Sequence, residues 1–311
     1  MPKAFTALLP ALCRCTFYPL ILATGLLTGC ERDSSPVYQP QYSESAPDKD
    51  PLYLFGVHPL HNPNRLYLTF GPLVDYLNQH IGGVRFKLEA SRNYAAYDKK
   101  LYAGRFHFAL PNPYQTVNSL QHNYHVFGKM ADDHNFRGII LARKDKNIRH
   151  VGQLKGNAIS FPAPTALAAT MMPQFYLQTN GLNVTEEIDI RYVGSQESSI
   201  MNVYLGNTLA GATWPPPWRA ISKERPELAQ ELEIVWRTEP LPNNGLVVRN
   251  DIAPEIVDQV ADLLFKLHTD EQGAKILDEI ELSKFEPASD TTYKPVVEFL
   301  DKFNAQVRPI K

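Results

Sequence analysis

Cysteine is scarce in this sequence, and the positions of the few cysteines exclude two kinds of protein. The chain has 3 cysteines, Cys13, Cys15 and Cys30, and all lie within its first 30 residues. Beyond them no thiol remains to form a disulfide framework or to act as a catalytic nucleophile. The stability of the rest of the chain must therefore come from a packed core.

Long apolar runs and familiar catalytic motifs are also missing beyond residue 30. No stretch approaches the ~18 consecutive apolar residues of a transmembrane helix. The sequence has no GxSxG elbow, HExxH helix or GxxxxGK[ST] loop, and Gly194-Ser195-Gln196 lacks the second glycine of such an elbow. We therefore expect no enzyme, no cofactor and no bound metal.

An excess of basic residues is absent as well. The chain carries 31 Lys and Arg against 33 Asp and Glu, which gives a formal net charge of −2. A mildly acidic chain without a basic run argues against nucleic acid as a partner.

The first 29 residues are typical of a bacterial export signal. Lys3 and Arg14 are their only charges, and Thr16 to Gly29 is uncharged and mostly apolar. The stretch ends Leu27-Thr28-Gly29-Cys30, which resembles a lipobox, in which the cysteine becomes the lipidated first residue. We predict a signal peptide over 1–29, lipidation at Cys30 and a periplasmic protein anchored by lipid to a bacterial membrane. An ordinary cleaved signal with a chance cysteine is the alternative.

Residues 30–50 follow as a predicted flexible tether. The segment 31–50 contains three Pro and four Ser but no Leu, Ile or Phe. Such a composition cannot bury a core. Folded sequence is therefore expected from about Pro51.

Strand-like and helix-like segments alternate beyond the tether. Leu52 to Val57 is a short apolar strand, and Val84 to Glu89 alternates apolar and charged residues. Between them, Pro72 opens a predicted helix with one apolar face. A second series begins near Val151, with a strand over 158–161 and a helix from about 165 to 180. This order favours an α/β fold with mostly parallel sheets covered on both faces.

Several segments together resemble the periplasmic phosphate/phosphite/phosphonate-binding proteins of ABC transporters. The resemblance spans roughly residues 51–300 and depends on the order and spacing of its landmarks: FGVHP (55–59), GPLVDYLN (71–78), NYAAYDKKLYAGRFHFAL (93–110), IILARKD (139–145), QLKGNAISF (153–161), RYVGSQES (191–198), EIVWRTEPLPNNGLVVRND (233–251) and DTTYKPVVEFL (290–300). It implies a type II periplasmic-binding-protein fold, with two α/β lobes joined by a two-segment hinge. Lobe 1 would comprise 51–150 plus 241–311, and lobe 2 would comprise 151–240. The hinge would cross near Arg143–Gly152 and Arg237–Asn244.

The resemblance implies a solute-binding component of an ABC transporter. Such a protein would act as a monomer, capture a phosphonate- or phosphate-like oxyanion or a related solute by lobe closure, and deliver it to the permease membrane subunits. A ligand-sensing module that signals to a membrane kinase is the alternative, because the fold does not separate the two. A metal-binding protein is a minor alternative, suggested by the spacings His58-x-x-His61 and His122-x-x-His125.

In the family, hydroxyl and backbone N–H groups at the start of a helix in the second lobe hold the oxyanion. The matching segment here is FPAPTALAATMMP (161–173), where Ala166, Leu167 and Ala168 occupy the hydroxyl positions. These three residues offer only backbone donors. Thr165 before them is the candidate N-cap. We therefore expect 165–168 to hold the anionic end of a ligand.

Two further candidate sites come from the second lobe. Ser195 ends a Gly-Ser turn, after which the family often has a histidine and an acidic residue; here that pair is Gln196-Glu197, and Ser195 and Gln196 are the candidates. Trp214 and Trp218 flank three prolines that predict a stiff loop, and Trp214 would form a cavity wall by stacking. Trp218 is as well explained by packing.

The candidates of the first lobe follow predicted strand ends, where α/β sheets place their ligands. His58 follows the first strand, Tyr94 begins a helix, and Tyr114 follows a later strand together with Asn112. Tyr94 and Tyr114 would form walls of the site. Asn243 and Asn244 lie at the return crossing and could face the cleft or form a turn.

Overall fold

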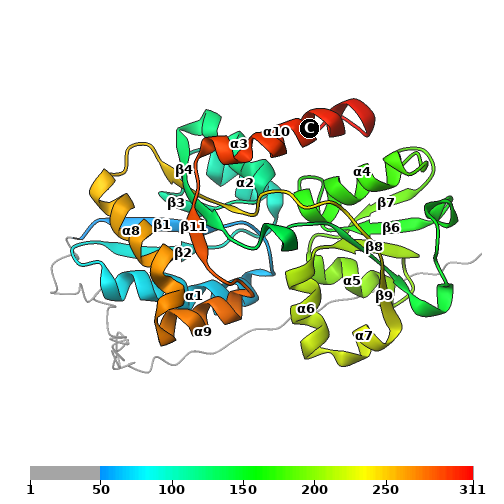
Figure 1. Cartoon of the computed structure of the whole chain (residues 1–311), viewed down its shortest axis with the longest axis horizontal. Coiled ribbons are helices and arrows are strands. Elements are labelled where there is room, and N and C mark those ends of the chain that lie inside the picture. The colour runs from blue at the N-terminus through cyan, green and yellow to red at the C-terminus, as the bar shows by residue number, and fades with distance from the viewer. Residues whose placement is uncertain (1–49, 311) are drawn as a thin grey trace, which may run out of the picture. The chain divides into compact units, whose positions relative to one another are not determined.

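The computed structural model describes residues 50–310, so the predicted signal peptide, the Cys30 lipidation site and nearly all of the tether lie outside the described residues. The described chain forms two β-sheets with helices packed on their faces (Figure 1). We call the six-stranded sheet with its helices the first lobe, and the five-stranded sheet with its helices the second lobe. None of the described helices is both long enough and apolar enough to cross a membrane.

The sheet of the first lobe has the strand order β11-β4-β10-β3-β1-β2. Strand β1 is parallel to β2 and β3, whereas β10 is antiparallel to β3 and β4, and β11 is antiparallel to β4. The strands are β1 (Leu52–Val57), β2 (Arg85–Glu89), β3 (Phe108–Leu110), β4 (Tyr124–Met130), β10 (Gly245–Arg249) and β11 (Phe285–Pro287).

The sheet of the second lobe has the strand order β7-β6-β8-β5-β9. Strand β6 is parallel to β7 and β8, and β5 is antiparallel to β8 and β9. The strands are β5 (Ile139–Arg143), β6 (Ala158–Phe161), β7 (Asp189–Tyr192), β8 (Ala210–Thr213) and β9 (Leu232–Arg237).

Apart from β11, the two sheets have the same strand order, because β2-β1-β3-β10-β4 corresponds to β7-β6-β8-β5-β9. Both sheets are mixed: most strands share one direction, as the sequence predicts, but β10 and β11 oppose it in the first sheet and β5 opposes it in the second. Strands β10 and β5 each arrive from the other lobe and begin beside the ends of β3 and β8. They must therefore run back along these strands in the opposite direction, which makes the pairing antiparallel.

The first crossing lies earlier in the chain than the sequence suggested. Residues up to 150 were expected in the first lobe, with the crossing near Arg143–Gly152. Ile139–Arg143, however, forms β5 and pairs with β8 and β9 of the second lobe. The chain therefore crosses between Met130 and Ile139, and it returns between Arg237 and Gly245.

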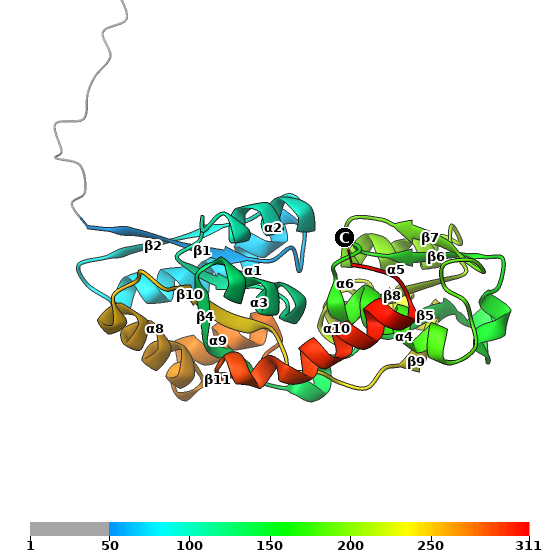
Figure 2. The ribbon, with the colours of Figure 1, turned by 90° about the horizontal axis from the view of Figure 1, so that it is seen from above.

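The first lobe carries α1 (Pro63–His80), α2 (Tyr94–Tyr102), α3 (Pro113–Ser119), α8 (Pro254–Lys266) and α9 (Glu271–Ile280), and the second carries α4 (Met172–Thr179), α5 (Gln196–Tyr204), α6 (Pro215–Glu224) and α7 (Pro226–Glu231). The C-terminal helix α10 (Lys294–Gln306), red in Figure 2, packs against α3 of the first lobe and α4 of the second. Beyond it, Arg308 donates to the carbonyl oxygen of Pro164 at 3.0 Å. The C-terminal segment, expected in the first lobe alone, therefore contacts both.

Two helix starts differ from the sequence expectation because of proline. Helix α1 begins at Pro63 rather than Pro72, since the Asn62 side chain caps it by accepting from the N–H of Arg65 at 3.0 Å. The three prolines 215–217, expected in a stiff loop, form the first turn of α6. Proline suits a first turn because N–H groups there have no intrahelical acceptor.

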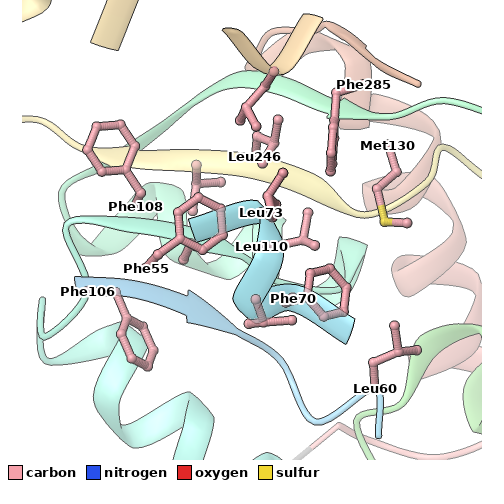
Figure 3. Packing of buried hydrophobic residues seen from close by; sticks show 14 of the residues in the cluster. Phe55, Leu60, Phe70, Leu73, Phe106, Phe108, Leu110, Met130, Leu246 and Phe285 are labelled. Atoms are coloured by element: carbon pink, nitrogen blue, oxygen red, sulfur yellow. The ribbon is translucent and has the colours of Figure 1, made fainter. Parts of the chain in front are cut away.

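The apolar core of the first lobe lies between its sheet and its helices. Phe55, Leu110 and Leu246 from the central strands pack with Phe70 and Leu73 from α1, all of them buried (Figure 3). The same buried cluster continues into residues around the second lobe: Phe136, Leu167, Ala168, Met171, Met172 and Trp214. The two lobes therefore share apolar contacts.

Candidate functional site

A small cavity of about 10 Å³ lies where the two lobes meet. Its walls come from the strand ends of the first lobe, the crossing segments and the helix starts of the second lobe: His58, Tyr94, Asn112, Phe136, Ala166, Leu167, Ala168, Ala169, Gln196, Trp214 and Asn244. This free volume is roughly what one water molecule needs.

The amino end of a helix opens on this cavity from the second lobe. After β6, a π-helical turn over Leu167–Met171 leads directly into α4. The first N–H groups of a helix have no intrahelical acceptor, and the cap residue Ala166 has no side-chain oxygen to bond them. The backbone N–H groups at Leu167, Ala168 and Ala169 are thus the donors that this wall offers.

Gly138 at the first crossing allows this helix end to lie where it does. A Cβ atom on Gly138 would lie 2.6 Å from the carbonyl oxygen of Ala168 and 2.7 Å from the Pro173 ring. Gly138 also donates its N–H to Thr238 Oγ1 at 2.9 Å, which joins the two crossing segments. The two crossing segments therefore pack directly against the helix end that offers the backbone N–H donors.

His58 contributes an acceptor from the first lobe. Its Nδ1 lies 2.9 Å from the carbonyl oxygen of Leu110. A carbonyl only accepts, so Nδ1 carries the hydrogen, and Nε2 of the neutral ring is an acceptor. Burial lowers the pKa of His58 to about 4, against a smaller raising effect of the Leu110 bond. The ring is therefore uncharged at neutral pH.

Tyr94 and Gln196 join the lobes across the cavity. Thr213 Oγ1 donates to Gln196 Oε1 at 2.8 Å, which turns the Gln196 Nε2 group toward Tyr94, whose hydroxyl oxygen accepts at 3.5 Å. The hydroxyl hydrogen of Tyr94 is then available to a further acceptor. Burial raises the pKa of Tyr94, so this donor persists at any physiological pH.

Asn244 supplies an acceptor that has no partner. The residue is buried, and its Nδ2 donates to Met130 Sδ at 3.3 Å, whereas Oδ1 is buried and has no hydrogen-bond partner within residues 50–310. Its neighbour Asn243, in contrast, makes its hydrogen bonds within the first lobe. The Asn243 Nδ2 group donates to the Ala131 carbonyl oxygen, and the Asn243 carbonyl oxygen accepts from the Tyr293 hydroxyl. A buried acceptor without a donor costs stability unless a ligand or water supplies one.

No residue that lines this cavity carries a formal charge at neutral pH. The donors are the backbone N–H groups of the helix end and the Tyr94 hydroxyl, and the acceptors are His58 Nε2 and Asn244 Oδ1. Such a set can hold a small polar group that presents several acceptors and at least one donor.

The profile of a protein family described as "ABC transporter, phosphonate, periplasmic substrate-binding protein" matches residues 55–293. The chain belongs to this family. This periplasmic substrate-binding protein therefore binds a small-molecule ligand as a component of an ABC transporter and works with permease subunits. The resemblance found in the sequence is confirmed.

Solved structures share the fold of this substrate-binding protein. A binding protein component of an ABC phosphonate transporter from Pseudomonas aeruginosa has a TM-score of 0.74 at 18% identity, over 81% of this chain and 87% of that chain. PhnD1 from Prochlorococcus marinus, in complex with methylphosphonate, has a TM-score of 0.75 at 19% identity, over 81% of this chain and 98% of that chain. These likenesses confirm the expected periplasmic-binding-protein fold.

Most of the site residues predicted from the sequence line the cavity of the substrate-binding protein. They come from both lobes and from the helix end: His58, Tyr94, Ala166, Leu167, Ala168, Gln196 and Trp214. Trp214 is buried, and its ring centroid lies 5.5 Å from that of Phe136. Trp218, one helical turn later, packs in the core of the second lobe instead.

Three predicted site residues lie outside the cavity lining. Tyr114 packs against the core of the first lobe from the start of α3. Ser195 caps α5, and its hydroxyl accepts from the Ser198 N–H at 3.0 Å. Thr165 is not the N-cap, because the helix begins one residue later; its carbonyl accepts from Asn112 Nδ2 at 3.0 Å, across the lobes.

Sequence reasoning missed Phe136 and Ala169 and left Asn112 and Asn244 out of its main set. Phe136 lies in the first crossing, which the sequence placed too late. Ala169 follows the predicted trio by one residue on the same helix end. No group of three or more His, Cys, Asp or Glu among residues 50–310 is arranged to hold a metal ion.

Proposed function

We propose that this protein captures a small solute in the cavity between its lobes, with the acceptor-rich end of the solute at the helix beginning at Leu167. The observation that carries the proposal is a buried helix end whose amide donors face a cavity that also contains the unpartnered Asn244 Oδ1. Amide donors and the helix dipole together favour a negatively charged group there.

The balance of donors and acceptors narrows the class of solute. His58 Nε2 and Asn244 Oδ1 both require a donor from the ligand, and no cationic side chain lines the cavity to neutralise a second negative charge. Dihydrogen phosphate, with one negative charge and two hydroxyl hydrogens, meets both requirements, and a singly protonated phosphonate, with one hydroxyl hydrogen, can donate to one of the two acceptors. A fully ionised dianion would face the two acceptors without a compensating cation.

Binding requires the lobes to separate. The free volume of about 10 Å³ is far below that of any phosphorus oxyanion, so a ligand would enter an open form and be enclosed when the lobes close. The contacts that re-form on closure include Asn62 Nδ2 with Glu197 Oε2 at 3.0 Å and Arg219 with Glu281 at 2.7 Å.

The test is a titration of the purified protein with phosphate, phosphite, methylphosphonate and 2-aminoethylphosphonate, followed by calorimetry, tryptophan fluorescence and melting temperature. A true ligand at ~100 times its Kd should stabilise the fold by about 2.7 kcal/mol. Trp214 in the cavity wall should report closure by a change in emission. If none of the four ligands produces heat, fluorescence change or stabilisation, the oxyanion proposal is wrong.

Two variants locate the binding in the cavity. Tyr94→Phe removes one donor and should weaken binding by about 0.5–1.5 kcal/mol. Tyr67→Phe removes a hydroxyl from the exposed face of α1 and serves as the matched control. Leu167→Ala should leave the affinity at or above that of the wild type, because the donor at this position is the backbone.

We further propose that the protein is exported with residues 1–29 as signal peptide, anchored through lipidated Cys30 to a bacterial membrane, and active as a monomer. The sequence Leu27-Thr28-Gly29-Cys30 supports the anchor. Cys30→Ser should release the protein from membranes and abolish labelling with radioactive palmitate. A wild-type protein that is bound to membranes but unlabelled would show that another anchor is used.

A further inference from the structure

Residues 307–310, which follow α10 and which we call the C-terminal tail, contact both lobes. Val307 packs against the buried apolar cluster of each lobe. The N–H of Ile310 donates to Asn304 Oδ1 at 2.9 Å, which turns the tail back onto α10. The side chain of Ile310 packs against the cluster of the first lobe. The tail is therefore fixed in place by contacts on both of its sides.

Arg308 in the tail joins α10 to the second lobe. Its guanidinium carbon lies 5.1 Å from the ring centroid of Phe303, a buried residue of α10. Its Nη2 donates to the carbonyl oxygen of Pro164 at 3.0 Å, and its Nε donates to Gln174 Oε1 at 3.2 Å. Gln174 is a buried residue of α4. A planar guanidinium suits this place, because it binds two acceptors at once while its face rests on an aromatic ring.

Two consecutive carbonyl groups just before the helix end are held by donors from outside the second lobe. Arg308 binds the carbonyl oxygen of Pro164. The side chain of Asn112 donates to the carbonyl oxygen of Thr165 at 3.0 Å. Because a peptide group is planar, fixing its carbonyl also fixes the direction of its N–H group. These two bonds therefore help to set the direction in which the helix starts and in which the N–H groups of 167–169 point.

Arg308 also brings a positive charge to this end of the helix. Within residues 50–310 its guanidinium bonds only to carbonyl and amide oxygens, and no carboxylate forms an ion pair with it. No residue that lines the cavity is charged at neutral pH. A positive charge that no carboxylate neutralises, placed beside a helix start, adds to the helix dipole in favouring an anion there.

We propose that Arg308 is a positioning residue of the binding site, which holds the chain before Leu167 so that the helix end presents its N–H donors to an anion. The inference rests on the proposed capture of an acceptor-rich group at that helix end. It adds to the site a residue that does not line the cavity and that lies near the C-terminal end of the chain. Arg308 acts through the Pro164 carbonyl and through its charge, without touching the ligand.

The first measurement is the affinity of three variants for phosphate and methylphosphonate by calorimetry. Arg308→Ala removes both donors and the charge, and should weaken binding by about fivefold to tenfold. Arg308→Lys keeps the charge and one donor, and should bind within about threefold of the wild type. Arg149→Ala is the matched control, because Arg149 also donates to a backbone carbonyl oxygen, that of Ile148 between β5 and β6. The control should leave both affinities unchanged.

The second measurement is amide hydrogen exchange of the ligand-free protein, which tests the positioning without any ligand. In Arg308→Ala the amides of residues 166–171 should exchange about threefold or more faster than in the wild type, because the preceding carbonyl has lost its donor. The amides of the central strand β1 should be unchanged. Urea unfolding in parallel separates this local effect from a general loss of stability, which would speed exchange in both segments.

The outcomes separate this inference from the proposed function. If the wild type binds either anion, an unchanged affinity in Arg308→Ala, an equal loss in Arg149→Ala, or a loss that Arg308→Lys does not reduce overturns the positioning role and leaves anion capture standing. If the wild type binds neither anion, their capture is wrong and exchange decides alone. Faster exchange confined to 166–171 in Arg308→Ala then supports the ordering of the helix end by Arg308, and unchanged exchange means that both proposals are wrong.

Discussion

The two lobes have the same strand order but bring different chemistry to the cavity between them. The second lobe offers mainly backbone amides at Leu167 to Ala169, surrounded by apolar side chains, whereas the first lobe offers polar side chains such as His58, Tyr94 and Asn244. Backbone donors survive most substitutions, but a side-chain acceptor is lost with one. The comparison teaches that substitutions can leave the second lobe's affinity for an anionic group intact, whereas side chains of the first lobe set which ligand is selected.

The largest effect is expected at the apolar wall of the second lobe. Trp214→Ala leaves a cavity beside Phe136 and should lower the free energy of unfolding by about 3–5 kcal/mol, measured by urea denaturation. Tyr67→Ala, at a side chain 48% exposed, should change it by less than ~0.5 kcal/mol. A loss below ~1 kcal/mol at Trp214 would mean that this wall does not pack against the first lobe.

The next effect concerns His58 on the first lobe. Its folded pKa of about 4 lies below the ordinary value of 6.5, so below pH 6.5 the unfolded chain binds a proton that the folded chain does not. Stability should therefore fall as pH drops from about 6.5 to about 4, by at most about 3 kcal/mol. Asp98, whose folded pKa is raised to about 6, acts in the opposite direction between about pH 6 and 4.

The contribution of His58 can be isolated by comparing His58→Gln with the wild type in urea at about pH 7 and pH 4.5. The loss of stability between these two pH values should be smaller in the variant. Equal losses would show that His58 is accessible to protons in the folded state, and the neutral acceptor assigned to the first lobe would then be incorrect.

The smallest effect on stability and ligand affinity is expected at a charged pair between the lobes on the surface of the protein, which we call the rim pair. Arg65 on α1 pairs with Glu224 on α6 through Nη1 and Nη2, each at 2.8 Å from a carboxylate oxygen, and the side chains are 24% and 56% exposed. Arg65→Ala should weaken ligand binding and stability by about 0.2–1 kcal/mol, less at high salt. Lys275→Ala breaks an exposed pair within α9 and is the control; an equal effect on ligand affinity would show that the rim pair does not help closure.

Local patterns predicted much of the fold and part of the site. The strands 52–57 and 158–161 appear where apolar runs placed them, since short apolar runs bounded by turn residues suit central strands. Seven of the predicted site residues line the cavity because they follow strands or begin helices. The first crossing was misplaced because β5 is defined by pairing with β9, about ninety residues away, which no local pattern reveals.

The sequence by itself determined that a helix with free backbone N–H groups at its start follows strand 158–161. The first N–H groups of a helix have no intrahelical acceptor, whatever side chains accompany them. It also determined that Ala166, Leu167 and Ala168 would add no hydroxyl to those donors. Only the tertiary structure decided which distant side chains face that helix end. Phe136 and Asn244 reach this region through the hinge and the packing of separate elements, and such contacts depend on the whole chain rather than on neighbours in sequence.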